Sequence, residues 1–327
     1  MSGLQQDLLN TVDRICEAHC TRQLRESAEA GAWPAALWRA LEEVGLTRAA
    51  LPEDSGGAGL EFGDAMLALR RSAYHALPVP LAETMIAGRL LAACGIKVPD
   101  GALTVASAEA KRVPWGNQCA HAVLAGQDEI ALFSLENLPS QVEKNLAGEP
   151  RANLDMHQEK PLARANLKGA AERLLLEGAL ARSVQMAGAL ERVLEQSLQY
   201  AGERVQFGRP IGKFQAVQHL LAVLAGQAAA SSAAADAAIE ASAAAADEFA
   251  VAVAKSRVGE AAGRGAEIAH QVHGAMGFTR EHNLHYSTRR LWSWRDEFGN
   301  ETCWQSRLGR QIAAKGADAL WPMLTAL

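Results

Sequence analysis

The sequence predicts a mainly α protein that carries a small β segment near its middle. About 65 of the 327 residues are alanine, and alanine has the highest intrinsic helix propensity. Apolar residues recur about every three to four positions over long stretches at both ends of the chain, which is the spacing of an amphipathic helix. Proline is low at 11 residues and β-branched residues are sparse, so a mainly β fold is not expected. We therefore expect an N-terminal helical domain over 1–98, a short β middle domain over 99–165 and a C-terminal four-helix-bundle-like domain over 166–327.

The N-terminal part has the pattern of helices joined by turns. Helical spacing extends over 35–46, 62–73 and 81–94. Between the first two of these segments lies a loop over 51–60 that contains three glycines and a proline. A glycine-rich loop can cradle a phosphate, but no Lys-Ser/Thr pair follows this one, which excludes a P-loop. We expect a tight connection between helices.

The middle part changes character. Short apolar runs occur at Leu103–Val105, Ala122–Ala125 and Ile130–Phe133, and they are separated by Gly, Asp, Asn and Pro. Such runs between turn residues predict short strands. The C-terminal part then shows three long helical patterns, Leu174 to Arg204, Phe214 to about Ala246 and Glu248 to His273. Long helices joined by short corners pack as an antiparallel bundle.

Composition excludes several function classes. The net charge of −5 gives no basic field for nucleic acid, and no nucleic-acid-binding motif is present. No uninterrupted apolar stretch reaches the roughly 18 residues of a membrane span, and the first ten residues lack the pattern of a secretory leader. The five cysteines are scattered and odd in number, which favours reduced thiols in a cytoplasmic protein.

Two segments in the C-terminal half carry a specific resemblance. The first is Tyr200-Ala-Gly-Glu-Arg204-Val-Gln-Phe207-Gly-Arg-Pro-Ile-Gly-Lys-Phe-Gln215, and the second is Gln271-Val-His-Gly-Ala-Met-Gly-Phe278. Together they closely resemble the acyl-CoA dehydrogenase family. The Gly-Gly-Ala-Gly-Leu loop at 56–60 and the Pro-Val-Pro-Leu segment at 78–81 are also similar to its N-terminal helical domain. The likeness covers nearly the whole chain and is strongest over 185–280.

The resemblance implies a flavin cofactor, FAD. In the family, an Arg, a Phe and a Gln reach across a subunit interface to the FAD of the neighbouring chain, and a Gln-x-x-Gly segment touches its ADP half. These roles carry over to Arg204, Phe207, Gln215, Gln271 and Gly274. The chemistry agrees, because a guanidinium offers a planar fork of donors that suits a pyrophosphate. Three residues separate Arg204 from Phe207, so we expect both to point to one side at the end of one helix.

The catalytic base is the first departure from the family. The family oxidises an acyl-CoA thioester between its α and β carbons, and a carboxylate, usually a Glu before Gly-Thr, removes the α proton. When Gly299 is aligned with that glycine, Phe298 stands where the base belongs, and Glu297 is one residue away. A minority of the family takes the base from the first long C-terminal helix. That position falls near Gly178, beside Glu177, and neither carboxylate is a clean match.

The middle domain is the second departure. Family members that bind flavin on their own carry a Thr-Glu-Pro-x-Ala-Gly-Ser-like segment there, within a longer β domain. This chain has Arg112-Val-Pro-Trp-Gly116 in that region. We therefore expect an incomplete pocket for the flavin ring and the acyl chain.

Both losses fit the shorter subunit of a heteromeric α2β2 acyl-CoA dehydrogenase, of the kind that acts on bulky CoA esters such as steroid side chains. A longer partner chain would supply the base and the pocket, and an electron-transferring flavoprotein would accept the electrons. One alternative is a self-sufficient homo-oligomer that uses Glu297 or Glu177 as base. Another is a flavin-free helical scaffold that only docks a partner. The acyl substrate does not follow from the sequence.

His270 and His273 are a further pair of candidate ligands. They stand three residues apart near the end of the third long helix. No carboxylate or third histidine accompanies them at a spacing known for metal sites. We therefore expect them to pack at the helix end.

Overall fold

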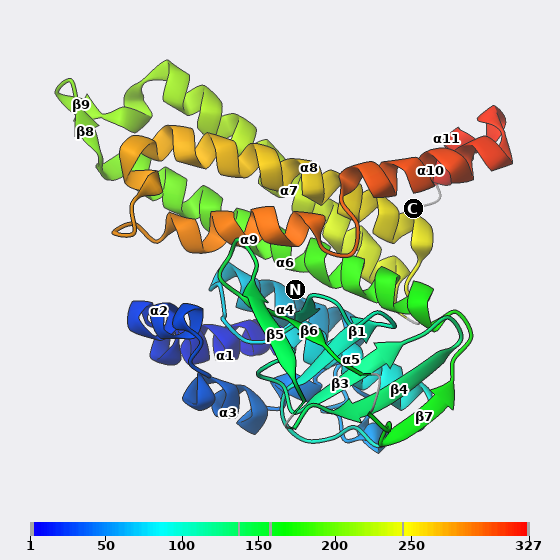
Figure 1. The fold of residues 1–327 in the computed structure, drawn as a ribbon. Coiled ribbons are helices and arrows are strands. Elements are labelled where there is room, and N and C mark those ends of the chain that lie inside the picture. Colours follow the sequence, from blue (N-terminus) through cyan, green and yellow to red (C-terminus); the bar gives the residue numbers. More distant parts are fainter. Residues whose placement is uncertain (1–2, 137, 157–158, 244, 326–327) are drawn as a thin grey trace. The chain divides into compact units, whose positions relative to one another are not determined.

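The computed structural model describes residues 3–136, 138–156, 159–243 and 245–325. Helices account for 62% of the residues and strands for 11%, with helices at both ends and the strands between them (Figure 1). The predicted mainly α fold with a β segment in the middle is therefore confirmed.

The chain divides into two compact units. Unit 1 comprises residues 1–72 and 77–178, and unit 2 comprises residues 73–76 and 179–327. The long helix α6 (Ala170–Glu203) runs from one unit into the other, and its first turns, up to Gly178, belong to unit 1.

Unit 1 begins with helices whose apolar faces supply its core. Gly45 ends the third helix region with a left-handed φ of 74°, a conformation that costs glycine little. Leu37 and Leu41 on α3 and Leu69 on α4 are fully buried. The helices of this part are α1 (Gly3–His19), α2 (Arg22–Ala30), α3 (Ala35–Glu43), η1 (Leu46–Arg48), η2 (Glu53–Ser55), α4 (Phe62–Tyr74) and α5 (Leu81–Ala93).

The strands of unit 1 form two small sheets. One sheet has four strands in the order β1-β3-β4-β7, and the other has three in the order β2-β6-β5. β1 and β3 pair in parallel, and the remaining pairs of both sheets are antiparallel. The strands are β1 (Leu103–Ser107), β2 (Val113–Pro114), β3 (His121–Ala125), β4 (Glu129–Ser134), β5 (Ser140–Lys144), β6 (Pro150–Leu154) and β7 (Ala163–Asn166).

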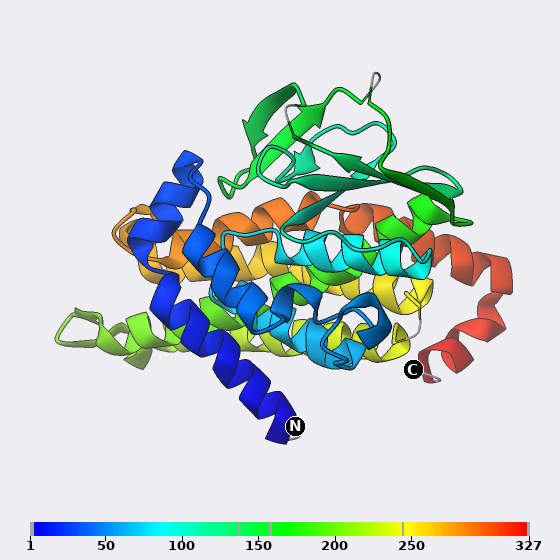
Figure 2. The same ribbon diagram turned by 90° about the horizontal axis from the view of Figure 1, so that it is seen from below.

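Unit 2 is a helical bundle. Its helix α8 packs against both α7 and α9, and the three helices run beside one another (Figure 2). A short hairpin, β8 (Val205–Gln206) with β9 (Arg209–Pro210), joins α6 to the next helical turn. The elements that follow it are η3 (Ile211–Lys213), α7 (Gln215–Ala241), α8 (Glu248–His273), η4 (Gly274–Phe278), α9 (Leu284–Asp296), α10 (Glu301–Lys315), η5 (Ala317–Ala319) and α11 (Leu320–Thr325).

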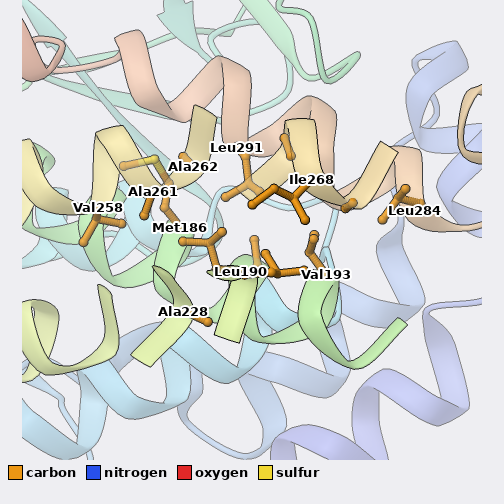
Figure 3. Close-up of a cluster of buried hydrophobic side chains, with 14 of the residues drawn as sticks. Met186, Leu190, Val193, Ala228, Val258, Ala261, Ala262, Ile268, Leu284 and Leu291 are labelled. Carbon is orange, nitrogen blue, oxygen red and sulfur yellow. The ribbon is translucent and has the colours of Figure 1, made fainter. Parts of the chain in front are cut away.

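The core of unit 2 consists mainly of side chains from α6, α7, α8 and α9, with Ala73 of α4 beside them. Leu190 on α6, Leu224 on α7 and Ile268 on α8 meet there, with many alanines between them (Figure 3). Gly265 on α8 lies so close to Leu190 that a Cβ there would come within 2.6 Å of its side chain. Small residues therefore set the close approach of these helices, as the alanine content suggests.

Helix α7 is the most apolar element. Among the described residues it is the one helix whose length and composition would allow it to cross a membrane, and 28% of its apolar window is buried. A core helix of a soluble protein meets the same criteria, and α7 packs along α8. The absence of a membrane span stays a prediction from the sequence.

Candidate functional site

The first part of the site is the hairpin that follows α6. Val205 pairs with Pro210 and Gln206 pairs with Arg209, which leaves a two-residue loop. Both loop residues have positive φ, 52° at Phe207 and 78° at Gly208. Two left-handed residues define the type I′ turn, whose twist matches that of paired strands. The hairpin therefore projects Phe207 at its tip, where 92% of the side chain is exposed.

The expectation that Arg204 and Phe207 share one helix end is wrong. Helix α6 stops at Glu203, and the Arg204 carbonyl accepts the amide of Ile211 at 2.8 Å, which closes the base of the hairpin. Pro210 has no amide proton to continue a helix. Arg204 thus stands at the base of the hairpin and Phe207 at its tip. Within the described part of the chain, the Arg204 side chain is exposed and makes no hydrogen bond or ion pair.

The other predicted cofactor residues lie close to the hairpin in unit 2. Gln215 is the first residue of α7 and is exposed. Gln271 and Gly274 stand at the C-terminal end of α8, where Gly274 ends the helix with φ 57° and ψ −139°. The Tyr200 ring of α6 stacks on His273 with ring centroids 4.5 Å apart. That contact brings the last turns of α6 and α8 together at one end of the bundle (Figure 1).

Several histidines lie close together at the C-terminal end of α8. His273 Nδ1 donates to the Ala269 carbonyl at 2.7 Å, and the His273 ring lies 4.6 Å from that of His282. Burial lowers the pKa of His273 to about 4 and also lowers the pKa of His270. Among the residues that the structure describes, His273 Nε2 and His270 Nδ1 are buried without a hydrogen-bond partner. Neutral rings at a helix end agree with the packing role expected from the sequence.

The second part of the site is the loop between α9 and α10. Glu297 follows the last residue of α9, and Asn300 caps α10 by accepting the Cys303 amide at 3.1 Å. Phe298 and Gly299 have φ values of 53° and 87°. The Trp304 indole donates to the Phe298 carbonyl at 2.9 Å. The loop that aligns with the catalytic base of the family is therefore short and firmly held.

Arg182 of α6 holds this loop in place through polar and aromatic contacts. Its Nε donates to Glu297 at 2.8 Å and its NH1 donates to Gln185 at 2.5 Å. The guanidinium lies 5.8 Å from the ring centroids of both Trp294 and Phe298. A buried arginine that contacts a carboxylate and two aromatic faces is a packed structural unit. Glu297 is the carboxylate of that unit.

Lys255 holds the end of α9 from the opposite helix. Its ammonium group, buried on α8, donates to the carbonyls of Trp294 at 3.3 Å and Arg295 at 2.7 Å. A cation at these last carbonyls satisfies acceptors that the helix leaves unpaired. Burial lowers the pKa of Lys255 to about 8. Neither Lys255 nor Arg182 was predicted from the sequence, although a charged residue inside an otherwise apolar helical pattern was the available signal.

Glu177, the other candidate base, lies in unit 1. Its two carboxylate oxygens accept Arg173 at 2.8 Å and Arg89 at 3.3 Å. The carboxylate is buried, and Arg89 in turn lies 4.3 Å from the centroid of the Phe62 ring. Two guanidinium groups on one buried carboxylate are the arrangement of a structural ion pair.

The segment expected to replace the flavin loop forms part of the β sheet. Val113 and Pro114 pair with β6, and Trp115 is buried behind them. Arg112 donates to Glu143 on β5 at 2.6 Å. In the described strands this segment therefore makes contacts within the sheet.

Comparison with known proteins decides the family. The acyl-CoA dehydrogenase N-terminal domain matches residues 2–97, and the acyl-CoA dehydrogenase C-terminal domain matches residues 168–296. The chain belongs to the acyl-CoA dehydrogenase family. An acyl-CoA dehydrogenase named IpdE2 from Mycolicibacterium smegmatis is 30% identical over 292 residues, which cover 87% of this chain and 91% of that protein. The resemblance stated from the sequence is thus confirmed.

Two solved structures of this family share the fold closely. A chain of the Tcur3481–Tcur3483 steroid acyl-CoA dehydrogenase superposes with a TM-score of 0.84 at 25% identity, over 95% of this chain and 98% of that one. A chain of the ChsE4–ChsE5 complex from Mycobacterium tuberculosis also reaches 0.84 at 23% identity, over 97% and 99% of the two chains. The first is similar in sequence and fold, and the second in fold.

The family generally depends on FAD, and several exposed residues of unit 2 have the chemistry that the ADP half of this cofactor requires. Arg204 offers guanidinium donors that no described residue accepts, of the kind that bind a diphosphate. Gln271 and Gln215 offer exposed amides, and Gly274 leaves open space where a side chain would stand. These residues would bind the cofactor at the surface of unit 2.

Proposed function

We propose that this chain is one subunit of an FAD-dependent acyl-CoA dehydrogenase that assembles with a longer chain of the same family. The observation that carries the proposal is the loop at 297–300. Phe298, which cannot take a proton, stands at the position of the base, and the adjacent Glu297 is bound by Arg182 at 2.8 Å. The longer chain supplies the carboxylate that removes the α proton.

Glu297 is poorly suited to act as the base. A general base needs a free lone pair within reach of the substrate proton. Glu297 instead belongs to the buried unit of Arg182, Gln185, Trp294 and Phe298. Glu177 shares its two oxygens between Arg89 and Arg173. Both carboxylates therefore have structural partners, which weakens the alternative of a self-sufficient enzyme.

In the proposal, the contribution of this chain is the cofactor arm, which we define as Arg204, Phe207, Gln215, Gln271 and Gly274. FAD, when bound, supplies the acceptor for the hydride that leaves the β carbon. Arg204 binds the diphosphate of that cofactor, and the exposed Phe207 covers it from the hairpin tip. A flavin-free scaffold has no need for an unpaired arginine and a fully exposed phenylalanine on one hairpin, which argues against that alternative.

The partner and the substrate class are proposed from related proteins. The Tcur3481–Tcur3483 protein is named as a steroid acyl-CoA dehydrogenase, and ChsE4–ChsE5 is described as a complex. We infer an α2β2 assembly for this chain and a bulky acyl-CoA, such as a CoA ester of a steroid side chain, as its substrate. An electron-transferring flavoprotein is the proposed acceptor, and the five free cysteines favour the cytoplasm.

The test is expression of this chain alone and together with the longer acyl-CoA dehydrogenase chain of its source. We expect the chain alone to bind no stoichiometric FAD and to oxidise no acyl-CoA. The co-expressed complex should be yellow, show the flavin absorbance band and reduce an artificial acceptor in the presence of a steroid side-chain CoA ester. A chain that binds FAD stoichiometrically and turns over acyl-CoA by itself would refute the proposal.

A further inference from the structure

An exposed aromatic ring at the same end of unit 2 has no role in the cofactor arm as defined. Phe278 ends the short helix η4, and 75% of its side chain is exposed. Its ring stacks on His270 with centroids 4.5 Å apart and planes at 29°. His270 stacks in turn on Trp292 of α9, at 5.4 Å and 10°. Three rings thus form a column that leads from the surface into the contact between α8 and α9.

The position of Phe278 in this column is set by its surroundings. His270 is held by the Thr288 hydroxyl at 3.0 Å from Nε2. At Gly277, a Cβ would lie 3.0 Å from the Cβ of His273 and 3.1 Å from Nδ1 of His270. A side chain at this position would crowd both histidines, so glycine favours the close approach of η4 to α8, and Phe278 lies on the His270 ring just after it. The phenylalanine is therefore held in place while most of its surface stays exposed.

Such a ring is suited to a flat aromatic ligand. Aromatic side chains stack on bases through their π faces, and each stack contributes measurably to nucleotide affinity. The polar groups near this end have the matching chemistry. Gln271 and Gly274 belong to the same α8–η4 segment as Phe278, and Tyr200, four residues before Arg204, stacks on His273. A ligand that places a purine on Phe278 and a diphosphate on Arg204 would be a dinucleotide.

We propose that Phe278 is the stacking platform for the adenine ring of the FAD in the assembled enzyme, and that His270 and Trp292 are positioning residues behind it. The inference rests on the proposed function, because it places the adenine end of the same cofactor. It adds a binding residue that the arm at Arg204 and Phe207 does not include.

The experiment uses the complex of this chain with its longer partner, freed of flavin and titrated with FAD, with ADP as a competitor, and with FMN. We expect Phe278→Ala to weaken FAD and ADP about tenfold, in the range of a lost base stack. Phe278→Tyr, the matched control, should retain wild-type affinity, and Phe278→Leu should behave like Phe278→Ala. FMN carries no adenine, so its affinity should not change.

Unchanged FAD and ADP affinity in Phe278→Ala would overturn the proposal. So would loss of the complex in gel filtration, because Phe278 would then belong to a subunit interface. Arg204→Ala separates this inference from the proposed function. If Arg204→Ala weakens FAD and Phe278→Ala does not, only the platform is wrong. If the wild-type complex binds no FAD, both are wrong.

The positioning role has its own readout. His270→Phe keeps a flat ring beneath Phe278, whereas His270→Leu does not. We expect His270→Leu to weaken ADP binding and His270→Phe to restore it, with both complexes intact in gel filtration. Equal ADP affinity in the two variants would show that the column has no role in binding.

Discussion

At the scale of single residues, the loop between α9 and α10 shows how a catalytic position can become structural. Phe298 adopts a left-handed φ of 53°, which is unfavourable for a bulky side chain. The cost is offset by the contacts of its ring with Arg182 and of its carbonyl with Trp304. Glu297 forms an ion pair with Arg182. The conformation of the loop therefore depends on its contacts with this arginine.

Glu297→Gln tests this reading of the loop. In the assembled enzyme we expect the rate of acyl-CoA oxidation to stay within about twofold of wild type, because the base lies on the partner chain. The thermal midpoint should fall, since Arg182 loses the charge of its partner, and breaking a largely buried pair is destabilising. Steady-state kinetics and a melting curve on the same preparation measure both. A rate loss of several orders of magnitude would make Glu297 the base.

His273 gives a prediction of pH dependence. Burial lowers its pKa from 6.5 to about 4, so the neutral ring contributes its stability above about pH 6.5 and loses it as the pH falls toward 4. Between pH 7 and about pH 5, the free energy of unfolding of wild type should fall about 2 kcal/mol more than that of His273→Phe. Phe keeps the stack on Tyr200. Urea titrations at the two pH values measure the difference, and parallel losses in both proteins would contradict it.

At the scale of elements, the helices and strands that were predicted correctly are those with the strongest local pattern. The helix predicted over Glu248 to His273 has those bounds in the structure, because apolar periodicity and a terminal glycine agree. Helix α7 ends at Ala241, short of the predicted Ala246, because its alanine tract contains no stop signal. The three apolar runs became β1, β3 and β4. The strands β2, β5, β6 and β7 were missed: β2 has two residues, β5 is exposed throughout, and β6 and β7 contain Arg and Asn among their apolar residues.

The hairpin after α6 was predicted only as a short corner between two long helices. Its type I′ loop normally contains Asn or Gly at the first position. Because phenylalanine stands there instead, the sequence does not indicate a two-residue hairpin. That mismatch of residue and turn points to a role for the ring outside the hairpin, because strained positions persist at functional sites. The cofactor residues were found from the motif, whereas their geometry was not.

Phe207→Asn exchanges this residue for one that the turn prefers. We expect the isolated chain to become slightly more stable, by up to about 1 kcal/mol, because Asn tolerates the left-handed region better than Phe. FAD affinity of the assembled complex should nevertheless fall, because the exposed ring at the tip is lost. Melting curves and a flavin titration measure the two effects. Gain or retention of both stability and FAD affinity would remove Phe207 from the cofactor arm.

At the scale of the whole molecule, the family and the order of its parts were predictable because they depend on long periodic segments and two motifs. The ion pairs that fill the catalytic loop were not, because Arg182 and Glu297 are 115 residues apart in the sequence and meet only in the folded bundle. The same holds for Lys255, which reaches the end of α9 from α8. Long-range polar contacts of this kind leave no local pattern.

The surface of α7 gives the last prediction. An apolar helix with only 28% of its apolar window buried leaves a large apolar face exposed, and soluble proteins rarely expose such a face unless it is covered by a partner. Small residues recur along its exposed surface, namely Ala222, Gly226, Ala229, Ala233 and Ala237, and His219, Asp236 and Glu240 are exposed beside them. Small residues at this spacing allow another helix to approach closely. The alanine excess of the chain is concentrated where an assembly would need it.

Ala229→Arg should therefore prevent assembly with the longer chain without unfolding this one. The arginine would stand on an exposed helical position, so the circular dichroism spectrum and the melting curve of the isolated chain should stay close to wild type. Ala36→Arg, at an exposed position of α3, is the matched control and should assemble normally. Gel filtration of the co-expressed chains separates the two outcomes. Normal assembly of Ala229→Arg would show that α7 faces solvent in the complete enzyme, and that its alanines serve only the packing within unit 2.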